Sequence, residues 1–233
     1  MQNELLLIAS VFLCFGGLML FYQFFGRAGL FAWIVIATIL GNIEVMILVR
    51  AFGMEQTLGN VIFATTLTAT DLLSELYGQK SAKLGVRLGI GASVVFLILS
   101  TLWKLYIPSP NDFAMPAVKA LFSLTPRLVL TSLLVYALIQ YLDVWLYHKI
   151  WAKTARKTGS KGQYLWLRSA GAALISQLVN AVLFNYGAFW GVYEGKVLFT
   201  LVASTFLIYF AVTLASAAFV YLARKMTPRE NIL

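Results

Sequence analysis

Long apolar runs are the feature of this sequence that most limits its fold. An α-helix needs roughly 20 apolar residues to cross the hydrocarbon core of a bilayer, and within lipid it satisfies its own backbone hydrogen bonds. Seven runs of suitable length follow one another along the chain: 5–25, 28–49, 57–76, 84–107, 127–147, 165–190 and 197–223. The sequence therefore predicts an all-α, polytopic helical membrane protein that forms a single transmembrane domain over residues 1–233.

The composition excludes several other classes of protein. Hydrophobic residues make up 61% of the chain and charged residues only 12%, whereas ordinary soluble domains carry roughly 25% charged residues. A soluble enzyme, a coiled coil and a disordered chain are therefore excluded. The single cysteine, Cys14, and the single histidine, His148, give no support to a disulfide, a metal site or a catalytic triad. We expect no enzyme activity, no cofactor and no metal.

Two segments are less regular than the rest. The third run, 57–76, is short, rich in threonine and ends in acidic residues, so we expect a helix that is broken or is buried by its neighbours. Without it the chain would have six transmembrane helices instead of seven. Residues 108–126 contain four of the five prolines and are expected to form an irregular extracytoplasmic connection, with a short interfacial helix over 113–124.

Lysine and arginine predict the orientation. With seven helices, one side of the membrane carries 13 of these residues and the other side carries five, which together are all 18 in the chain. Cytoplasmic loops of membrane proteins carry the excess of positive charge. The N-terminus is therefore expected outside, the C-terminus in the cytoplasm, and residues 148–164 in a basic cytoplasmic loop. The net charge of +9 is explained by these loops, and no nucleic-acid partner is expected.

Four carboxylates fall within the apolar runs: Glu44, Asp71, Glu75 and Asp143. An ionisable residue inside a transmembrane segment is costly and is by default a functional candidate. Asp71 and Glu75 are four residues apart, so they share one helix face and repel each other unless a proton or a cation lies between them. The alternative is that both pair with basic residues at positions 80, 83 or 87. Glu44 is a candidate proton carrier or the partner of an arginine.

Two later runs carry polar stripes at helical spacing. The stripe in the fifth run consists of Tyr136, Gln140, Asp143 and Tyr147, and that in the sixth of Gln177, Asn180, Phe184 and Asn185. Amide and carboxylate groups can read the donors and acceptors of a heterocycle, and aromatic rings can stack on it. The alternative is that these groups hydrogen-bond between helices and hold the bundle together.

Two sequence blocks resemble a known family. Residues 70–82, TDLLSELYGQKSA, match a T-D-x-x-x-E-x-Y-G-x-x-x-A signature, and a second block follows in order with Tyr141–Val144, Leu165–Arg168 and Ser176–Leu178. Both blocks are similar to those of the queuosine precursor transporter family, which is also called the vitamin uptake transporter family. The resemblance departs after the arginine of the second block, where members usually carry an asparagine and this chain has Ser169 and Ala170, and at Asn180, where they usually carry an aspartate.

The resemblance implies the uptake of a 7-deazaguanine across the bacterial inner membrane for the salvage of queuosine in tRNA. The substrate would be 7-cyano-7-deazaguanine, 7-aminomethyl-7-deazaguanine or queuine, and import would proceed by ion- or proton-coupled alternating access. No GxxxxGK[ST] motif is present, so this chain is not expected to use ATP itself. The alternative function is that of a substrate-binding subunit of an energy-coupling-factor vitamin importer. The expected partners are the small-molecule substrate, the lipid bilayer and a second copy of the chain in a homodimer.

The resemblance also suggests roles for the intramembrane residues. Asp71 or Glu75 is expected to accept hydrogen bonds from the guanine edge, because a carboxylate can accept from N1–H and the exocyclic amine together. Gln140, Gln177 and Asn180 would read the rest of the ring, while Tyr77, Tyr136 or Phe184 would stack on it. Asp143 is assigned to substrate binding and, together with Glu44, to ion or proton coupling.

Overall fold

The computed structural model describes residues 2–122, 126–158 and 164–228 and is built almost entirely of helices. The elements, in chain order, are α1 (Gln2–Glu44), β1 (Leu48–Ala51), β2 (Met54–Thr57), α2 (Gly59–Tyr77), α3 (Gln79–Trp103), α4 (Met115–Leu121), α5 (Pro126–Thr158), α6 (Leu165–Phe189) and α7 (Gly195–Lys225). Helices α1, α3, α5, α6 and α7 are long and apolar enough to cross a bilayer. The chain is therefore a polytopic helical membrane protein, as the apolar runs predict.

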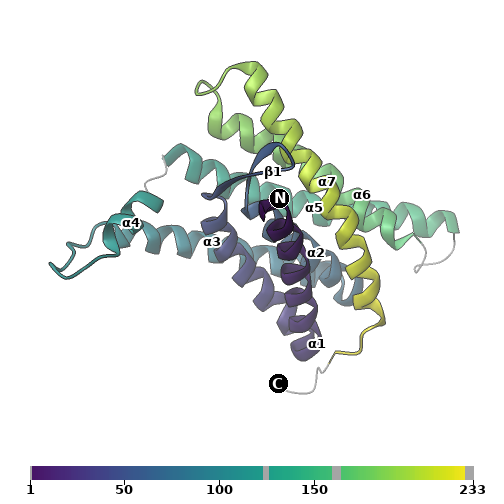
Figure 1. Cartoon of the computed structure of the whole chain (residues 1–233). Helices are drawn as coiled ribbons and strands as arrows, with labels where there is room; N and C mark the ends of the chain where they lie inside the picture. Colours follow the sequence, from purple (N-terminus) through teal and green to yellow (C-terminus); the bar gives the residue numbers. More distant parts are fainter. Residues whose placement is uncertain (1, 123–125, 159–163, 229–233) are drawn as a thin grey trace.

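Helix α1 reverses its direction at Gly26. This residue has φ 54° and ψ −129°, a backbone conformation that costs glycine little and other residues much more. The Phe21 and Trp33 rings meet edge to face, with their centroids 5.6 Å apart. Asn3 Nδ2 donates to the carbonyl oxygen of Arg50 at 2.9 Å, so the start of α1 lies beside the segment that follows its end. The stretches before and after Gly26 therefore run side by side, as Figure 1 shows for the purple helix.

A short β-hairpin joins α1 to α2 and was not predicted from the sequence. Its two strands pair antiparallel, with Leu48 opposite Thr57 and Ala51 opposite Met54. Phe52 and Gly53 between them both have positive φ, at 53° and 74°, as in the type I′ turns that suit two-residue hairpins. Each strand has only four residues, too few to give a clear alternating pattern between two long apolar runs. The hairpin lies across one end of the bundle (Figure 1).

Helix α2 is continuous and central, so the expectation of a broken third helix was wrong and that of a buried one was right. Every residue from Gly59 to Ser74 except Phe63 is buried. The threonine hydroxyls hydrogen-bond to carbonyl oxygens of the preceding turn; for example, Thr65 Oγ1 donates to Ile62 and Thr70 Oγ1 to Leu67. The polar threonines therefore need no break in the helix and no water.

The remaining connections also differ from the predicted ones in detail. Among the described residues of the predicted irregular segment 108–126, Met115–Leu121 forms α4 and Pro126 already begins α5. Helix α4 projects away from the bundle (Figure 1). Helix α5 continues to Thr158, so most of the predicted basic loop 148–164 extends the helix. Residues 159–163 of that loop lie outside the described residues. The buried core between α1, α2 and α3 includes the side chains of Leu30, Ile34, Leu72 and Val86.

Candidate functional site

A cavity of about 410 Å³ lies between α1, the β-hairpin, α2, α3, α5, α6 and α7. Its volume is within the range of about 300–1,000 Å³ that is usual for small-molecule sites. Its lining extends from the β-hairpin, at one end of the bundle, to Thr66 near the middle of α2. Among the described residues, no side chain in the lining is charged. Its polar members are Thr38, Asn42, Gln56, Thr57, Asn60, Thr66, Ser93, Ser132, Tyr136, Asn180, Asn185, Tyr193, Thr205 and Tyr209.

Gln56 on β2 is the clearest candidate for a ligand contact in this cavity. Its side chain lines the cavity and is 5% exposed. Neither Nε2 nor Oε1 has a hydrogen-bond partner among the described residues. A buried amide without partners costs roughly 1–3 kcal/mol. Both amide atoms are covered in this structure, so a polar ligand would satisfy them once the side chain turns toward the cavity. No pattern in the sequence points to this residue, because Gln56 lies between two apolar runs in a hairpin that was not predicted.

Hydrogen bonds hold two of the other cavity amides in fixed orientations. Asn42 Nδ2 donates to the Thr38 carbonyl oxygen at 2.8 Å and to Ser93 Oγ at 3.2 Å. Asn180 Nδ2 donates to Tyr209 Oη at 2.9 Å. In both residues the amide nitrogen is thus engaged with protein groups. A side chain fixed in this way can orient a ligand with little further loss of conformational entropy.

Aromatic rings form part of the cavity wall. Phe63 is the central ring: its centroid lies 6.0 Å from that of Tyr136 and 6.1 Å from that of Tyr209. Phe184 and Phe189 form a second pair, with centroids 6.2 Å apart. All five residues line the cavity. This arrangement suits a flat, polar, aromatic ligand, since such rings favour stacked or edge-on contacts with one another.

A buried polar layer lies directly beyond the floor of the cavity. Gln140 Nε2, on α5, donates to Thr66 Oγ1 at 2.7 Å, so the two residues link the floor to the interior. Asp71 and Asp143 lie deeper, with 2% and 0% of their surface exposed. Ser169 Oγ donates to Asp71 Oδ2 at 2.5 Å. Neither aspartate is part of the cavity lining.

Glu75 forms an ion pair with Arg168 at the far end of this layer. Arg168 Nη2 lies 2.6 Å from Glu75 Oε1, and the side chain of Arg168 is completely buried. Tyr147 Oη donates to Glu75 Oε2 at 2.7 Å, and Arg224 Nε lies 3.6 Å from Glu75 Oε1. The guanidinium of Arg168 also lies over the Trp151 ring, 4.5 Å from its centroid. This group, the Glu75 cluster below, ties α2 to α5, α6 and α7.

The structure brings some of the predicted site residues together and separates others. Tyr136, Asn180 and Phe184 line the cavity, and Gln140 contacts it through Thr66. Asp71 and Glu75 do share one side of α2, but Glu75 pairs with Arg168 and not with a basic residue at 80, 83 or 87. The sequence did not predict this pairing, because 93 residues separate its two members.

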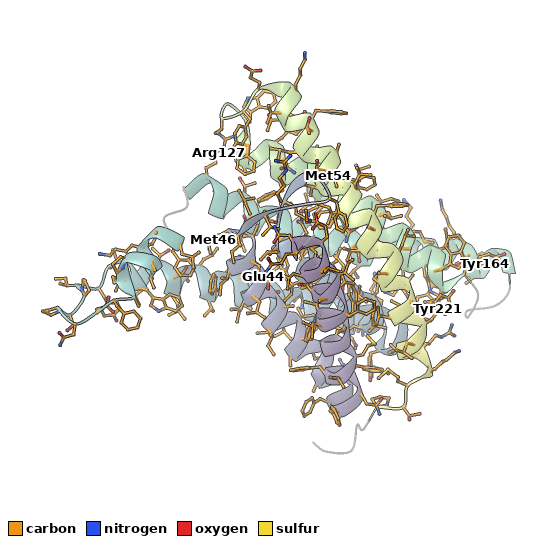
Figure 2. The ribbon with its side chains drawn as sticks, viewed as in Figure 1. Glu44, Met46, Met54, Arg127, Tyr164 and Tyr221 are labelled. Atoms are coloured by element: carbon orange, nitrogen blue, oxygen red, sulfur yellow. The ribbon has the colours of Figure 1, made fainter. Side chains whose placement is uncertain are left out.

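Three other predicted residues lie away from the cavity. Gln177 Oε1 accepts a hydrogen bond from Thr213 Oγ1 at 2.7 Å and thereby joins α6 to α7. Tyr77 is half-buried at the end of α2, where the Arg27 guanidinium lies 6.0 Å from its ring centroid. Glu44 is half-buried at the end of α1 beside the start of the hairpin (Figure 2) and is not part of the lining.

Comparisons with known proteins agree with the resemblance seen in the two sequence blocks. Residues 57–223 match the family model described as "Putative vitamin uptake transporter". A protein of Bacillus subtilis (strain 168) named "Probable queuosine precursor transporter" is 38% identical over 213 residues, which cover 91% of each chain. No solved structure matches the chain significantly. The matched region contains the described polar layer and most of the cavity lining.

Proposed function

This chain belongs to the vitamin uptake transporter family, and from that premise we propose that it imports a queuosine precursor, a 7-deazaguanine, into the cell. The cavity of about 410 Å³ would be the substrate site. The name of the Bacillus subtilis relative supports this substrate class. The observation that carries the proposal is the unpartnered amide of Gln56, which lies in an uncharged cavity walled by aromatic rings.

The chemistry of a 7-deazaguanine suits this cavity. Its flat ring system presents N–H donors and a carbonyl acceptor along one edge, and an amide side chain offers a donor and an acceptor of its own. We assign the reading of this edge to Gln56 and Asn180, and the stacking to Phe63, Tyr136 or Phe184. Asp71 and Glu75 lie outside the lining, so the direct contact with the guanine edge that the sequence suggested is reassigned to these amides.

The arrangement also supports an orientation in the cytoplasmic membrane. We propose seven crossings, with α1 counted as two because it reverses at Gly26. The cavity lies at the hairpin end, which is the end with fewer basic residues, and would face outward. The Glu75 cluster would close the cytoplasmic end, where Arg168 and Arg224 lie. Opening of one end and closing of the other around the cavity would constitute alternating access.

The uncharged lining predicts a preference among the three precursors. We expect 7-cyano-7-deazaguanine, which is neutral, to be taken up better than 7-aminomethyl-7-deazaguanine or queuine, whose amines are cationic at neutral pH. Burying an unpaired cation costs several kcal/mol, so at least about a tenfold higher concentration of a cationic precursor should be needed.

The experiment measures queuosine in the tRNA of cells that lack both precursor synthesis and their own importer. Cells expressing this chain would be fed each precursor separately at a series of concentrations. The nitrile should restore queuosine at the lowest concentration. Rescue by the aminomethyl compound at an equal or lower concentration would refute the preference. No rescue by any feed, with the protein present in the membrane, would refute the proposed function.

Replacement of Gln56 by leucine tests the assigned contact. The change keeps the size of the side chain nearly the same and removes the free donor and acceptor. We expect the KM for the nitrile to rise by about ten- to a hundredfold, the equivalent of one or two hydrogen bonds to a buried ligand. Gln79→Leu, at an exposed position on α3, is the matched control and should keep the KM of the original protein. An unchanged KM in Gln56→Leu would exclude Gln56 from the binding site.

A further inference from the structure

Two buried carboxyl groups face each other between the cavity and the Glu75 cluster. Asp71 comes from α2 and Asp143 from α5, and they are 2% and 0% exposed. Their side chains lie within hydrogen-bonding reach of each other. Asp71 Oδ1 and both carboxylate oxygens of Asp143 nevertheless have no donor among the described residues. We refer to these two residues as the carboxyl pair.

No described cation neutralises the carboxyl pair. Arg168 and Arg224 are both directed at Glu75. The ionisable groups that face the pair are Glu75 on its own helix, Tyr147 on α5 and, through Glu75, the two arginines on α6 and α7. Within the described part of α1 and α3, no ionisable group interacts with the pair. Two adjacent negative charges in a dry interior would be strongly unfavourable.

Other buried groups around the pair also have unused hydrogen-bonding capacity. The hydroxyl of Ser176, which is fully buried, faces Asp143, but the two groups do not have the geometry of a hydrogen bond. Gln140 is fully buried too, and its Oε1 is unpartnered. Around the carboxyl pair, the unpartnered acceptor oxygens therefore outnumber the unpartnered donors. One added proton would turn an acceptor of the carboxyl pair into a donor and would remove one negative charge.

We propose that Asp71 and Asp143 together form the proton-binding site that couples import to the proton gradient. A proton from the outside binds to one carboxylate oxygen and is shared with the other aspartate; it leaves to the cytoplasm when the protein has opened inward, which restores the carboxylate. This inference rests on the proposed function. A proton suits the pair better than a metal cation, because a cation would hold the two carboxyl groups apart as its ligands.

The position of the pair explains how substrate and proton could be coupled. Gln140 lies one helical turn before Asp143 on α5, and its amide nitrogen donates to Thr66 on the cavity floor at 2.7 Å. On α2, Asp71 follows Thr66 by five residues and precedes Glu75 by four. A substrate that shifts the floor would therefore act on the same two helices that carry the pair. The proton site thus lies between the substrate cavity and the Glu75 cluster, which would close the cytoplasmic end.

The experiment uses the purified protein in liposomes with labelled 7-cyano-7-deazaguanine and a membrane potential clamped at zero. Accumulation under a pH gradient is compared with counterflow, which exchanges substrate without a gradient. For one proton per substrate, a gradient of one pH unit should give about a tenfold accumulation. Asp143→Asn should lose this accumulation and keep counterflow within about threefold. Asp112→Asn, in the exposed 108–114 segment, is the control and should behave like the original protein.

The outcomes separate this inference from the proposed function. Accumulation by Asp143→Asn equal to that of the original protein, or accumulation that follows a sodium gradient instead of the pH gradient, would overturn proton coupling at the pair. If Asp143→Asn lost counterflow too, Asp143→Glu, which keeps a carboxyl group, should restore both activities; failure to restore them would also overturn it. Absence of counterflow in the original protein would refute the transport function itself.

Discussion

Replacing Arg168 with methionine is expected to lower the free energy of unfolding by about 3 kcal/mol or more, because it leaves the carboxylate of Glu75 buried without its main partner. Arg168 is completely buried, and two of its nitrogens lie within 3.0 Å of Glu75 oxygens. Arg224 remains nearby, but its Nε is 3.6 Å from Glu75 and its side chain is 39% exposed, so it compensates only in part. Thermal unfolding of the detergent-solubilised protein measures the loss.

Two further variants separate the effect of the charge from that of a shortened side chain. Arg156 is exposed near the end of α5. Arg156→Met should therefore unfold at nearly the same temperature as the original protein. The double variant Glu75→Gln with Arg168→Met removes both charges and should recover most of the lost stability, because the cost of the single change comes from an unpaired charge. An Arg168→Met protein as stable as the original would contradict the Glu75 cluster as described.

Thr205→Trp is expected to reduce substrate uptake by at least about tenfold. Thr205 lies on α7, is only partly buried and lines the cavity. A tryptophan side chain is rigid and as bulky as the two-ring system of a deazaguanine. It would therefore occupy the space proposed for the substrate while leaving the helix packing behind it unchanged. Uptake in the cells described above measures the effect, with the amount of protein in the membrane determined in parallel.

Thr200→Trp is the matched control for this blocked cavity. Thr200 lies on the same helix but is exposed, and its hydroxyl donates to the carbonyl oxygen of Lys196 at 3.0 Å. A tryptophan there meets lipid or its interface with water, where this residue is common in membrane proteins. Uptake by the control should be close to that of the original protein. Full uptake by Thr205→Trp would show that the substrate does not use this cavity.

The helical architecture could be predicted from the sequence because a backbone within lipid must satisfy its own hydrogen bonds, as a continuous helix does. The lengths of the apolar runs were sufficient to expect two helices where the structure has the single long element α1, which reverses its direction at Gly26. The polar stripe in α5 also faces the interior as predicted: Tyr136 lines the cavity, while Gln140, Asp143 and Tyr147 are buried. Helical periodicity determines such a face before any tertiary contact is known.

The parts that could not be predicted depend on contacts between distant segments. Glu75 and Arg168 are brought together only when α2 packs against α6, and the sequence offered closer basic residues as partners. Gln56 became a candidate because the hairpin places it over the cavity.

The relative's name also favours a transporter over the vitamin-binding subunit that the sequence left as an alternative.

The two departures from the family pattern now have structural contexts. Ser169, at the first departure from the resembled pattern, donates its hydroxyl to Asp71 of the carboxyl pair. Asn180, at the second departure, donates to Tyr209 in the cavity wall. Both positions therefore bear on the site proposed here: one contacts the proton site and the other contributes an amide to the uncharged lining.

Uptake of labelled 7-cyano-7-deazaguanine by liposomes that contain only this purified protein is the decisive experiment for the proposed import. We expect saturable uptake that unlabelled nitrile competes away and that Thr205→Trp abolishes, with Thr200→Trp active. Uptake no greater than in protein-free liposomes, while the protein is folded and inserted, would contradict it.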